Sequence, residues 1–178
     1  MKKIIFLEGL PGVGKTTMVN AIKKLEQNDL NTVDEITNDD NFVIGDLDQS
    51  FFMRNDEMKI NKYSNGTVII DRGFISTLSY NQTKEIINHN HSCKDIRDWF
   101  EKNKDIYLSD NVYVYYLTNK QSRFHIPYIN EEDPYGSVEN QKLLESISLF
   151  NINKYVKNYK IIEYYQENME EVIDEIIN

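Results

Sequence analysis

The stretch from Gly9 to Thr16 constrains this chain more than any other part of it. It reads G-L-P-G-V-G-K-T and fits the pattern G-x-x-x-x-G-K-[ST] at every fixed position. An apolar run, Lys2–Glu8, precedes it and predicts a buried strand, and an amphipathic segment, Thr16–Gln27, follows it and predicts a helix. Glycines let a loop turn its backbone N–H groups inward, and a helix N-terminus carries partial positive charge. The stretch therefore predicts a site for nucleotide phosphates; the alternative is a glycine-rich turn that binds nothing.

Two side chains of this loop have the chemistry that ATP and Mg²⁺ need. Lys15 is expected to reach the β and γ phosphates of ATP and to take part in catalysis, and the Thr16 hydroxyl is expected to bind Mg²⁺. The predicted cofactor-binding residues are Gly9, Leu10, Pro11, Gly12, Val13, Gly14, Lys15, Thr16 and Thr17.

Length and charge limit the kinds of partner. A chain of 178 residues that is 40% hydrophobic suits one globular domain, and we expect no second one. A net charge of −9 argues against binding to duplex nucleic acid, which needs a basic surface. A single cysteine, Cys93, and the absence of a long apolar run favour a cytoplasmic protein without a disulfide or a membrane span. We expect a small-molecule phosphate acceptor as the partner, and a homodimer is possible.

Strand and helix patterns alternate along the chain and predict an α/β fold. Strands joined by helices imply a parallel sheet with right-handed crossovers. In such sheets the ligand is expected beyond the carboxyl ends of the strands. A stretch without a regular period, Thr118–Pro134, is a candidate lid. The other predicted elements are strands within 30–36 and at Thr67–Asp71, Val112–Leu117 and Tyr159–Tyr164, and helices at Asp48–Tyr63, Ser76–Asn88 and Lys94–Lys102, around Leu143–Phe150 and over Met169–Ile177.

Charged residues end several of the predicted strands and should converge near the glycine loop. Glu8 and Glu35 end the first two strands, and Asp71 and Arg72 end the third. Asp71 has the position of a carboxylate that holds Mg²⁺, although a strand-ending carboxylate can also satisfy nearby backbone. Arg72 could bridge the donor and acceptor phosphates as a catalytic residue, or form an ordinary surface ion pair.

Four further roles follow from residue type and position. Arg123, in the candidate lid, could stabilise the charge of phosphoryl transfer, or be a solvated arginine of a loop. Phe51 and Arg54, three apart on a predicted helix, could stack on and steer an acceptor ring, although core packing is the commoner role of a phenylalanine. Glu35 could take a proton from an acceptor hydroxyl, fix a sugar hydroxyl, or be an exposed strand end.

Two segments resemble the signatures of the thymidylate kinase and deoxynucleoside kinase group of P-loop kinases. They are Phe6–Thr17 and Asp71–Gln82. In thymidylate kinases the second signature runs D-R-Y-x-x-S-x-x-A-Y-Q, and Asp71, Arg72, Ser76 and Tyr80 match it. The resemblance covers nearly the whole chain. It implies a five-stranded parallel sheet in the order 2-3-1-4-5 with a lid, kinase activity with ATP and Mg²⁺, and an acceptor pocket that includes Tyr80.

The acceptor differs between the two halves of that group, and the chain has features of each. Pro11 stands where thymidylate kinases carry an aspartate, and Asp34-Glu35-Ile36-Thr37 stands where they have R-E-P-G-G. Glu35 resembles the carboxylate with which deoxynucleoside kinases activate a sugar 5′-hydroxyl, while their E-R-S motif appears here as Asp71-Arg72-Gly73. A nucleoside and a nucleoside monophosphate both remain candidate acceptors.

Three functions fit these patterns. The first is ATP-dependent phosphoryl transfer to a nucleoside or nucleoside monophosphate. The second is transfer to a non-nucleotide alcohol, and the third is a P-loop ATPase or switch module that binds a protein partner. The Ser76 and Tyr80 pattern favours the kinases, because a switch needs no acceptor pocket.

Overall fold

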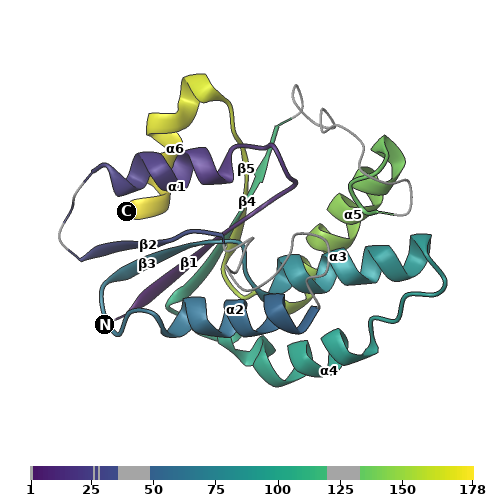
Figure 1. Ribbon diagram of the computed structural model, residues 1–178. Helices are drawn as coiled ribbons and strands as arrows, with labels where there is room; N and C mark the ends of the chain where they lie inside the picture. Colours follow the sequence, from purple (N-terminus) through teal and green to yellow (C-terminus); the bar gives the residue numbers. More distant parts are fainter. Residues whose placement is uncertain (1, 26, 28, 36–48, 120–132) are drawn as a thin grey trace.

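A parallel sheet of five strands forms the centre of the molecule, with helices on both of its faces (Figure 1). The computed structural model describes residues 2–25, 27, 29–35, 49–119 and 133–178. The strands are β1 (Lys3–Glu8), β2 (Leu30–Val33), β3 (Thr67–Asp71), β4 (Val112–Thr118) and β5 (Tyr159–Glu163). The helices are α1 (Lys15–Lys23), α2 (Gln49–Asn61), α3 (Phe74–Ile87), α4 (Lys94–Asn103), α5 (Val138–Tyr155) and α6 (Met169–Ile177), with short 3₁₀ helices η1 (Lys104–Leu108) and η2 (Gln166–Asn168).

The strand order β2-β3-β1-β4-β5 confirms the predicted topology. β1 lies at the centre and pairs in parallel with β3 and β4, so that Leu7 lies opposite Asp71 and Glu8 opposite Tyr116. This register brings the carboxyl ends of the three middle strands to one edge of the sheet. The glycine loop leaves β1 at the same edge.

Alternating side chains of β1 supply two separate cores. Ile4 and Phe6 pack with buried residues of α3, α4 and α5 on one face of the sheet. Ile5 and Leu7 pack with α1 and α6 on the other face. Because side chains of a strand alternate between its faces, an unbroken apolar run is what a strand covered on both sides requires.

Three apolar residues that lie within the predicted helices are exposed. α1 ends at Lys23 rather than at Gln27, and Leu25 lies in the following turn with 44% of its surface exposed. Met58 of α2 and Phe150 of α5 are 59% and 62% exposed. In α5 a polar residue lies at the buried interface instead: Asn151 donates from Nδ2 to the hydroxyl of Ser79 and to the side-chain carbonyl of Gln82. These bonds satisfy the buried amide and join α5 to α3.

The remaining predicted elements agree closely with the structure. β3 has the predicted bounds, and α3 begins two residues before the predicted Ser76, with Gly73 as its N-cap. Ile36 and residues 120–132 of the candidate lid lie outside the described residues, so the lid stays a prediction. Within the described ranges no helix is long and apolar enough to cross a membrane.

Candidate active site

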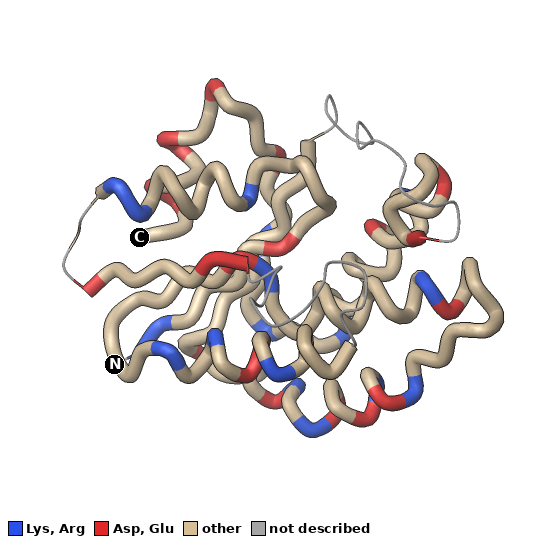
Figure 2. The backbone as a smooth tube through the Cα atoms, in the orientation of Figure 1, with Lys and Arg blue, Asp and Glu red and all other residues tan. Residues whose placement is uncertain are grey.

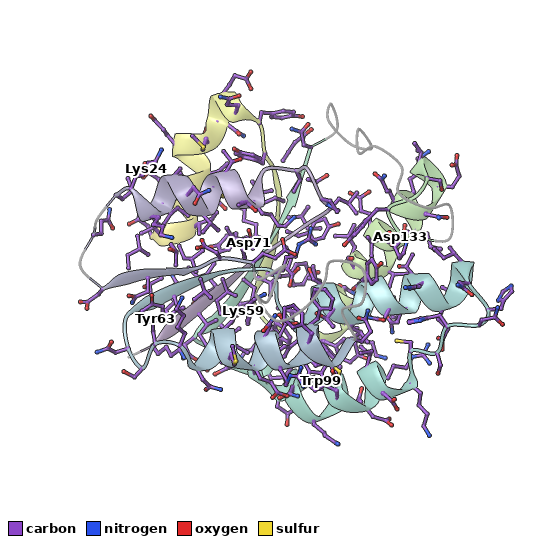
Figure 3. The ribbon with its side chains drawn as sticks, in the orientation of Figure 1. Lys24, Lys59, Tyr63, Asp71, Trp99 and Asp133 are labelled. Atoms are coloured by element: carbon purple, nitrogen blue, oxygen red, sulfur yellow. The ribbon has the colours of Figure 1, made fainter. Side chains whose placement is uncertain are left out.

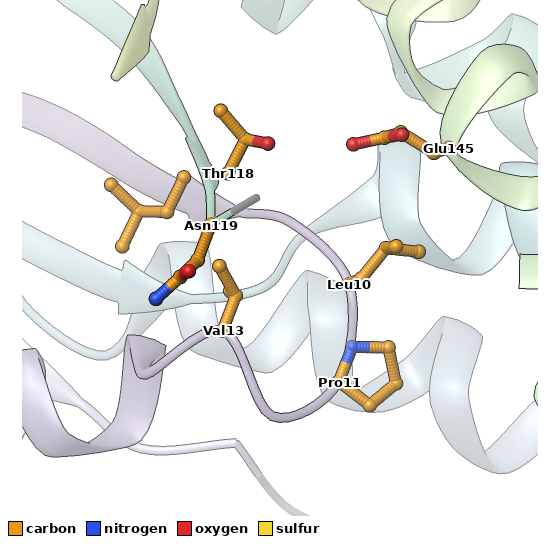
Figure 4. A pocket seen from close by; sticks show the side chains of 7 residues that line it. Leu10, Pro11, Val13, Thr118, Asn119 and Glu145 are labelled. Carbon is orange, nitrogen blue, oxygen red and sulfur yellow. The ribbon is translucent and has the colours of Figure 1, made fainter. Parts of the chain in front are cut away.

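The glycine loop has a backbone that only glycine adopts easily at its key positions. Gly9, Gly12 and Gly14 have φ angles of 139°, 77° and 101°. A Cβ added at Gly9 would lie 2.4 Å from the carbonyl oxygen of Leu117, and one added at Gly14 would lie 2.4 Å from the ring of Tyr164. The loop is thus held close to the end of β4 and to the residue that follows β5. Figure 4 shows the same loop around a small pocket between Leu10, Pro11 and Val13, the end of β4, and Glu145 of α5.

Lys15 is folded back over the loop that precedes it. The side chain is buried, and its Nζ donates to the carbonyl oxygens of Gly9 and Leu10, both at 2.9 Å. Burial, and after it the charge of Arg72, lowers the pKa of Lys15 to about 7. A phosphate group at this loop would favour the charged ammonium and offset the cost of its burial. The structure therefore places Lys15 at the glycine loop, and its contact with phosphate stays a prediction.

Thr16 and Asp71, the two residues predicted to hold a metal ion, are in contact at the carboxyl ends of the strands. The Thr16 hydroxyl donates to Asp71 Oδ2 at 2.7 Å, while Asp71 Oδ1 is buried and has no hydrogen-bond partner among the described residues. An unpartnered carboxylate oxygen beside a hydroxyl fits a hard cation such as Mg²⁺, directly or through water. The described residues hold no cluster of three or more metal-binding side chains.

Arg72 and Glu35 form an ion pair beside the glycine loop. Arg72 Nε lies 2.8 Å from Glu35 Oε1, and Nη1 donates to the carbonyl oxygen of Gly9 at 3.4 Å. Figure 2 shows acidic and basic segments next to each other in the middle of the molecule, at the strand ends. The structure thus brings together three of the four residues predicted to be catalytic: Lys15, Glu35 and Arg72. The fourth, Arg123, lies outside the described residues.

The buried carboxylate of Glu8 contacts the residues that follow Arg72. One carboxylate oxygen accepts the Gly73 N–H at 3.0 Å, and the other accepts the hydroxyl of Ser76. Gly73 replaces the tyrosine of the signature D-R-Y, and the packing gives the reason: a Cβ here would lie 2.5 Å from the ring of Phe6. Burial raises the pKa of Glu8 to about 7, against the opposing effects of the Ser76 hydroxyl and Arg72.

The raised pKa of Glu8 predicts a pH-dependent stability. Between pH of about 4.5 and 7 the folded protein holds a proton on Glu8 that the unfolded chain has lost, so stability falls as pH rises through this range. We expect Glu8→Gln to remove this loss, which amounts to about 3 kcal/mol at neutral pH for a shift of this size. Urea denaturation of both proteins from pH 4.5 to 8 measures it. A constant difference between the two curves would contradict the prediction.

The predicted acceptor residues lie in different surroundings. Phe51 of α2 is buried. Arg54 is exposed and lines an open depression of about 780 Å³ that also contains Asp34 and Met58. Tyr80 of α3 donates from its hydroxyl to Asp133 Oδ2 at 2.7 Å. A contact between any of these residues and an acceptor stays a prediction.

Sequence reasoning missed three residues near the site. Asp56 and Lys59 of α2 form a buried ion pair of 3.1 Å. Tyr135 lines a small cavity with Glu8 and Arg72; burial raises its pKa, and Arg72 opposes that effect. Helical periodicity assigns polar residues to solvent, so it gave Asp56 and Lys59 no role. Their opposite charges three residues apart were the available signal.

Comparison with known proteins identifies the fold. No family profile matches the sequence, and no curated protein matches it. Solved structures do: thymidylate kinase from Candida albicans has a TM-score of 0.64 at 15% identity, covering 98% of this chain and 88% of the other. The chain has the thymidylate kinase fold. Thymidylate kinase from Ehrlichia chaffeensis has a TM-score of 0.64 at 19% sequence identity, and the match covers 99% of this chain and 97% of the other. Deoxyadenosine kinase from M. mycoides, with the products dCMP and dCDP bound, has a TM-score of 0.66 at 16% identity, and the match covers 98% of this chain and 97% of the other. At these sequence identities the similarity shows the fold.

Proposed function

We propose that this protein transfers the γ-phosphate of ATP to a nucleoside or a nucleoside monophosphate. The observation that carries the proposal is the convergence at Gly9: its carbonyl oxygen accepts bonds from both Lys15 and Arg72, and Glu35 is paired with the same arginine. A phosphate-binding loop, a carboxylate that can accept a proton and a second cation at one sheet edge suit phosphoryl transfer between two bound molecules.

Each group has a separate task in this proposal. Lys15 exchanges its bonds to the loop carbonyls for the β and γ phosphates of ATP. Thr16 and Asp71 would hold Mg²⁺, which neutralises phosphate charge and orients the γ-phosphate when bound. Arg72 lies between the loop and Glu35, where its planar guanidinium can contact oxygens of both the donor and the acceptor.

The acceptor class depends on Glu35. A nucleoside hydroxyl must lose its proton, and Glu35 can accept it while Arg72 keeps the carboxylate in place. A monophosphate is already ionised, and Arg72 would then leave Glu35 to bind it. The fold supports both, since the similar structures include thymidylate kinases and a deoxyadenosine kinase.

A coupled assay with ATP tests the proposal. Nucleosides and nucleoside monophosphates are screened together with non-nucleotide alcohols, and hydrolysis without an acceptor is measured in parallel. We expect acceptor-dependent release of ADP with at least one nucleoside or monophosphate. Transfer only to another alcohol, or hydrolysis that no acceptor stimulates, would overturn the proposal.

Asp71→Asn tests the proposed metal site. The variant keeps an oxygen that accepts from Thr16 but loses the negative charge that a divalent cation requires. We expect the Mg²⁺ concentration for half-maximal activity to rise by about tenfold or more, as is typical when a side chain that orients a metal's ligands is lost. Titration of activity with Mg²⁺ after treatment with EDTA measures it. An unchanged titration would show that Asp71 has only a structural role.

A further inference from the structure

Arg72 has a backbone conformation that is uncommon for its residue type. Its φ angle is 60°, in the left-handed region, where a residue with a Cβ is disfavoured by about 1 kcal/mol. Such a conformation persists where surrounding bonds fix it. The conformation also sets the direction in which the guanidinium leaves the end of β3.

All four polar groups of the two peptide units beside Arg72 are hydrogen-bonded. The Arg72 N–H donates to the carbonyl of Leu7 at 3.0 Å, and the Gly73 N–H donates to Glu8 at 3.0 Å. The carbonyl oxygens of Asp71 and Arg72 both accept from Lys59 Nζ, at 3.2 and 3.4 Å. β1 therefore holds the two N–H groups, and one side chain of α2 holds the two carbonyls. Figure 3 labels Lys59 on α2 and Asp71 at the end of β3, near each other in the view.

Lys59 is fully occupied and buried. An ammonium has three N–H donors, and its third partner here is Asp56 Oδ1 at 3.1 Å. The second oxygen of Asp56 accepts from the Thr77 hydroxyl of α3 at 2.7 Å. Lys59 and Asp56 are each 4% exposed. A buried ion pair adds little net stability compared with apolar residues of similar size. We therefore consider the geometry that this pair imposes on its neighbours.

We propose that Lys59 is a positioning residue: it holds Arg72 in the left-handed conformation and so aims the guanidinium at the phosphate site. The kinetic part of this inference rests on the proposed function. Loss of the clamp formed by Lys59, Asp56 and Thr77 would free the two carbonyls and let the arginine shift. A displacement of about 1 Å at a reacting group can cost about 10²-fold in rate.

The neutral pair Asp56→Asn/Lys59→Met tests the clamp without leaving a buried charge. We expect kcat to fall by about 10- to 100-fold. The KM for MgATP should stay within about threefold, since Lys15 and the glycine loop bind phosphate separately. In an Arg72→Met background the same pair should cause little further loss, because its effect acts through Arg72. A parent-like kcat of the pair variant would overturn the proposal. So would an equal further loss of kcat when the pair is added to Arg72→Met.

Arginine NMR gives a readout that needs no turnover. The chain has four arginines, and the Nε–H signal of Arg72 is identified by its loss in Arg72→Lys. Arg72 Nε is buried, whereas Arg97 is in an exposed ion pair with Glu85. In the pair variant we expect exchange of the Arg72 Nε–H to speed up at least tenfold and that of Arg97 to stay constant. Unchanged exchange at Arg72 would overturn the proposal, even if the parent phosphorylated no acceptor and the proposed function failed.

Two further variants separate positioning from stability. Thr77→Val removes only the hydroxyl that donates to Asp56, and it serves as the test if the double variant does not fold. It should lower kcat and speed up exchange of the Arg72 Nε–H. Asn151→Ala breaks a buried hydrogen-bond network with Ser79 and Gln82, in which Arg72 takes no part. It should lower the melting temperature while leaving kcat and Arg72 exchange unchanged below that temperature. If Thr77→Val left both quantities at parent values, the clamp would have no role in aiming Arg72.

Discussion

Lys15→Ala is expected to lower kcat by about 10²–10³, because it removes the cation that meets the charge developing on the phosphates. The fold should survive, since within the described residues the ammonium donates its hydrogen bonds to carbonyls of its own loop. Steady-state rates with the acceptor found by screening measure the effect. Circular dichroism and the melting temperature show whether the fold is retained.

Lys23→Ala is the matched control for this substitution. It removes a lysine from the same helix, but one that pairs with Asp34 on the surface. Surface pairs of this kind contribute little, so the variant should have parent-like activity and stability. Turnover of Lys15→Ala within tenfold of the parent would mean that the Gly9–Thr16 loop is not the catalytic phosphate site.

Glu35→Gln separates the two acceptor classes. With a nucleoside acceptor we expect kcat to fall by about 10²–10⁴, because the amide cannot take up the hydroxyl proton. With a monophosphate acceptor no proton has to be removed. The substitution then mainly releases Arg72 from its ion pair and should change the acceptor KM more than kcat. The measurement is kcat and KM for the acceptor, at fixed saturating ATP.

Asp34→Asn is the control for the Glu35 substitution, since it changes the adjacent carboxylate, which pairs with Lys23 at the surface. Arg54→Ala, measured in the same way, tests the predicted contact of α2 with the acceptor. Parent-like constants for both Glu35→Gln and Arg54→Ala would mean that neither side chain contacts the acceptor, and would direct attention to Tyr80 and Tyr135.

The sequence predicted those parts of the site that depend on local pattern. The glycine spacing defined the loop, and an apolar strand ending in Asp71 and Arg72 placed both residues at the sheet edge, where the structure has them. The strand order came from the resemblance and is confirmed. What the sequence left out depends on contacts between distant elements. The pairing of Lys59 with the carbonyls of residues 71 and 72, and the approach of Tyr135 to Arg72, join segments that no periodicity relates.

The partners of Glu8 were also not predictable from the sequence. Its place at a strand end predicted a group that converges on the open edge of the site. The structure turns it to the Gly73 N–H and the hydroxyl of Ser76, so its bonds serve the backbone beneath Arg72. The position of a residue in a strand sets where its side chain leaves the backbone. The packing of the following helix determines its hydrogen-bond partners.

The close fit of Gly14 against Tyr164 has a consequence for synthesis of the protein. The core on the α1 face of the sheet joins residues of β1, α1, β3 and β4 to residues of β5 and α6, and Gly14 lies against Tyr164, so residues made much later in synthesis support the glycine loop. A ribosome that adds about 5–20 residues per second will have made the loop many seconds before Tyr164 exists. During that interval the nascent chain carries the nucleotide motif without its support. Nucleotide binding should therefore begin late in translation, as a sign that the last strand has joined the sheet.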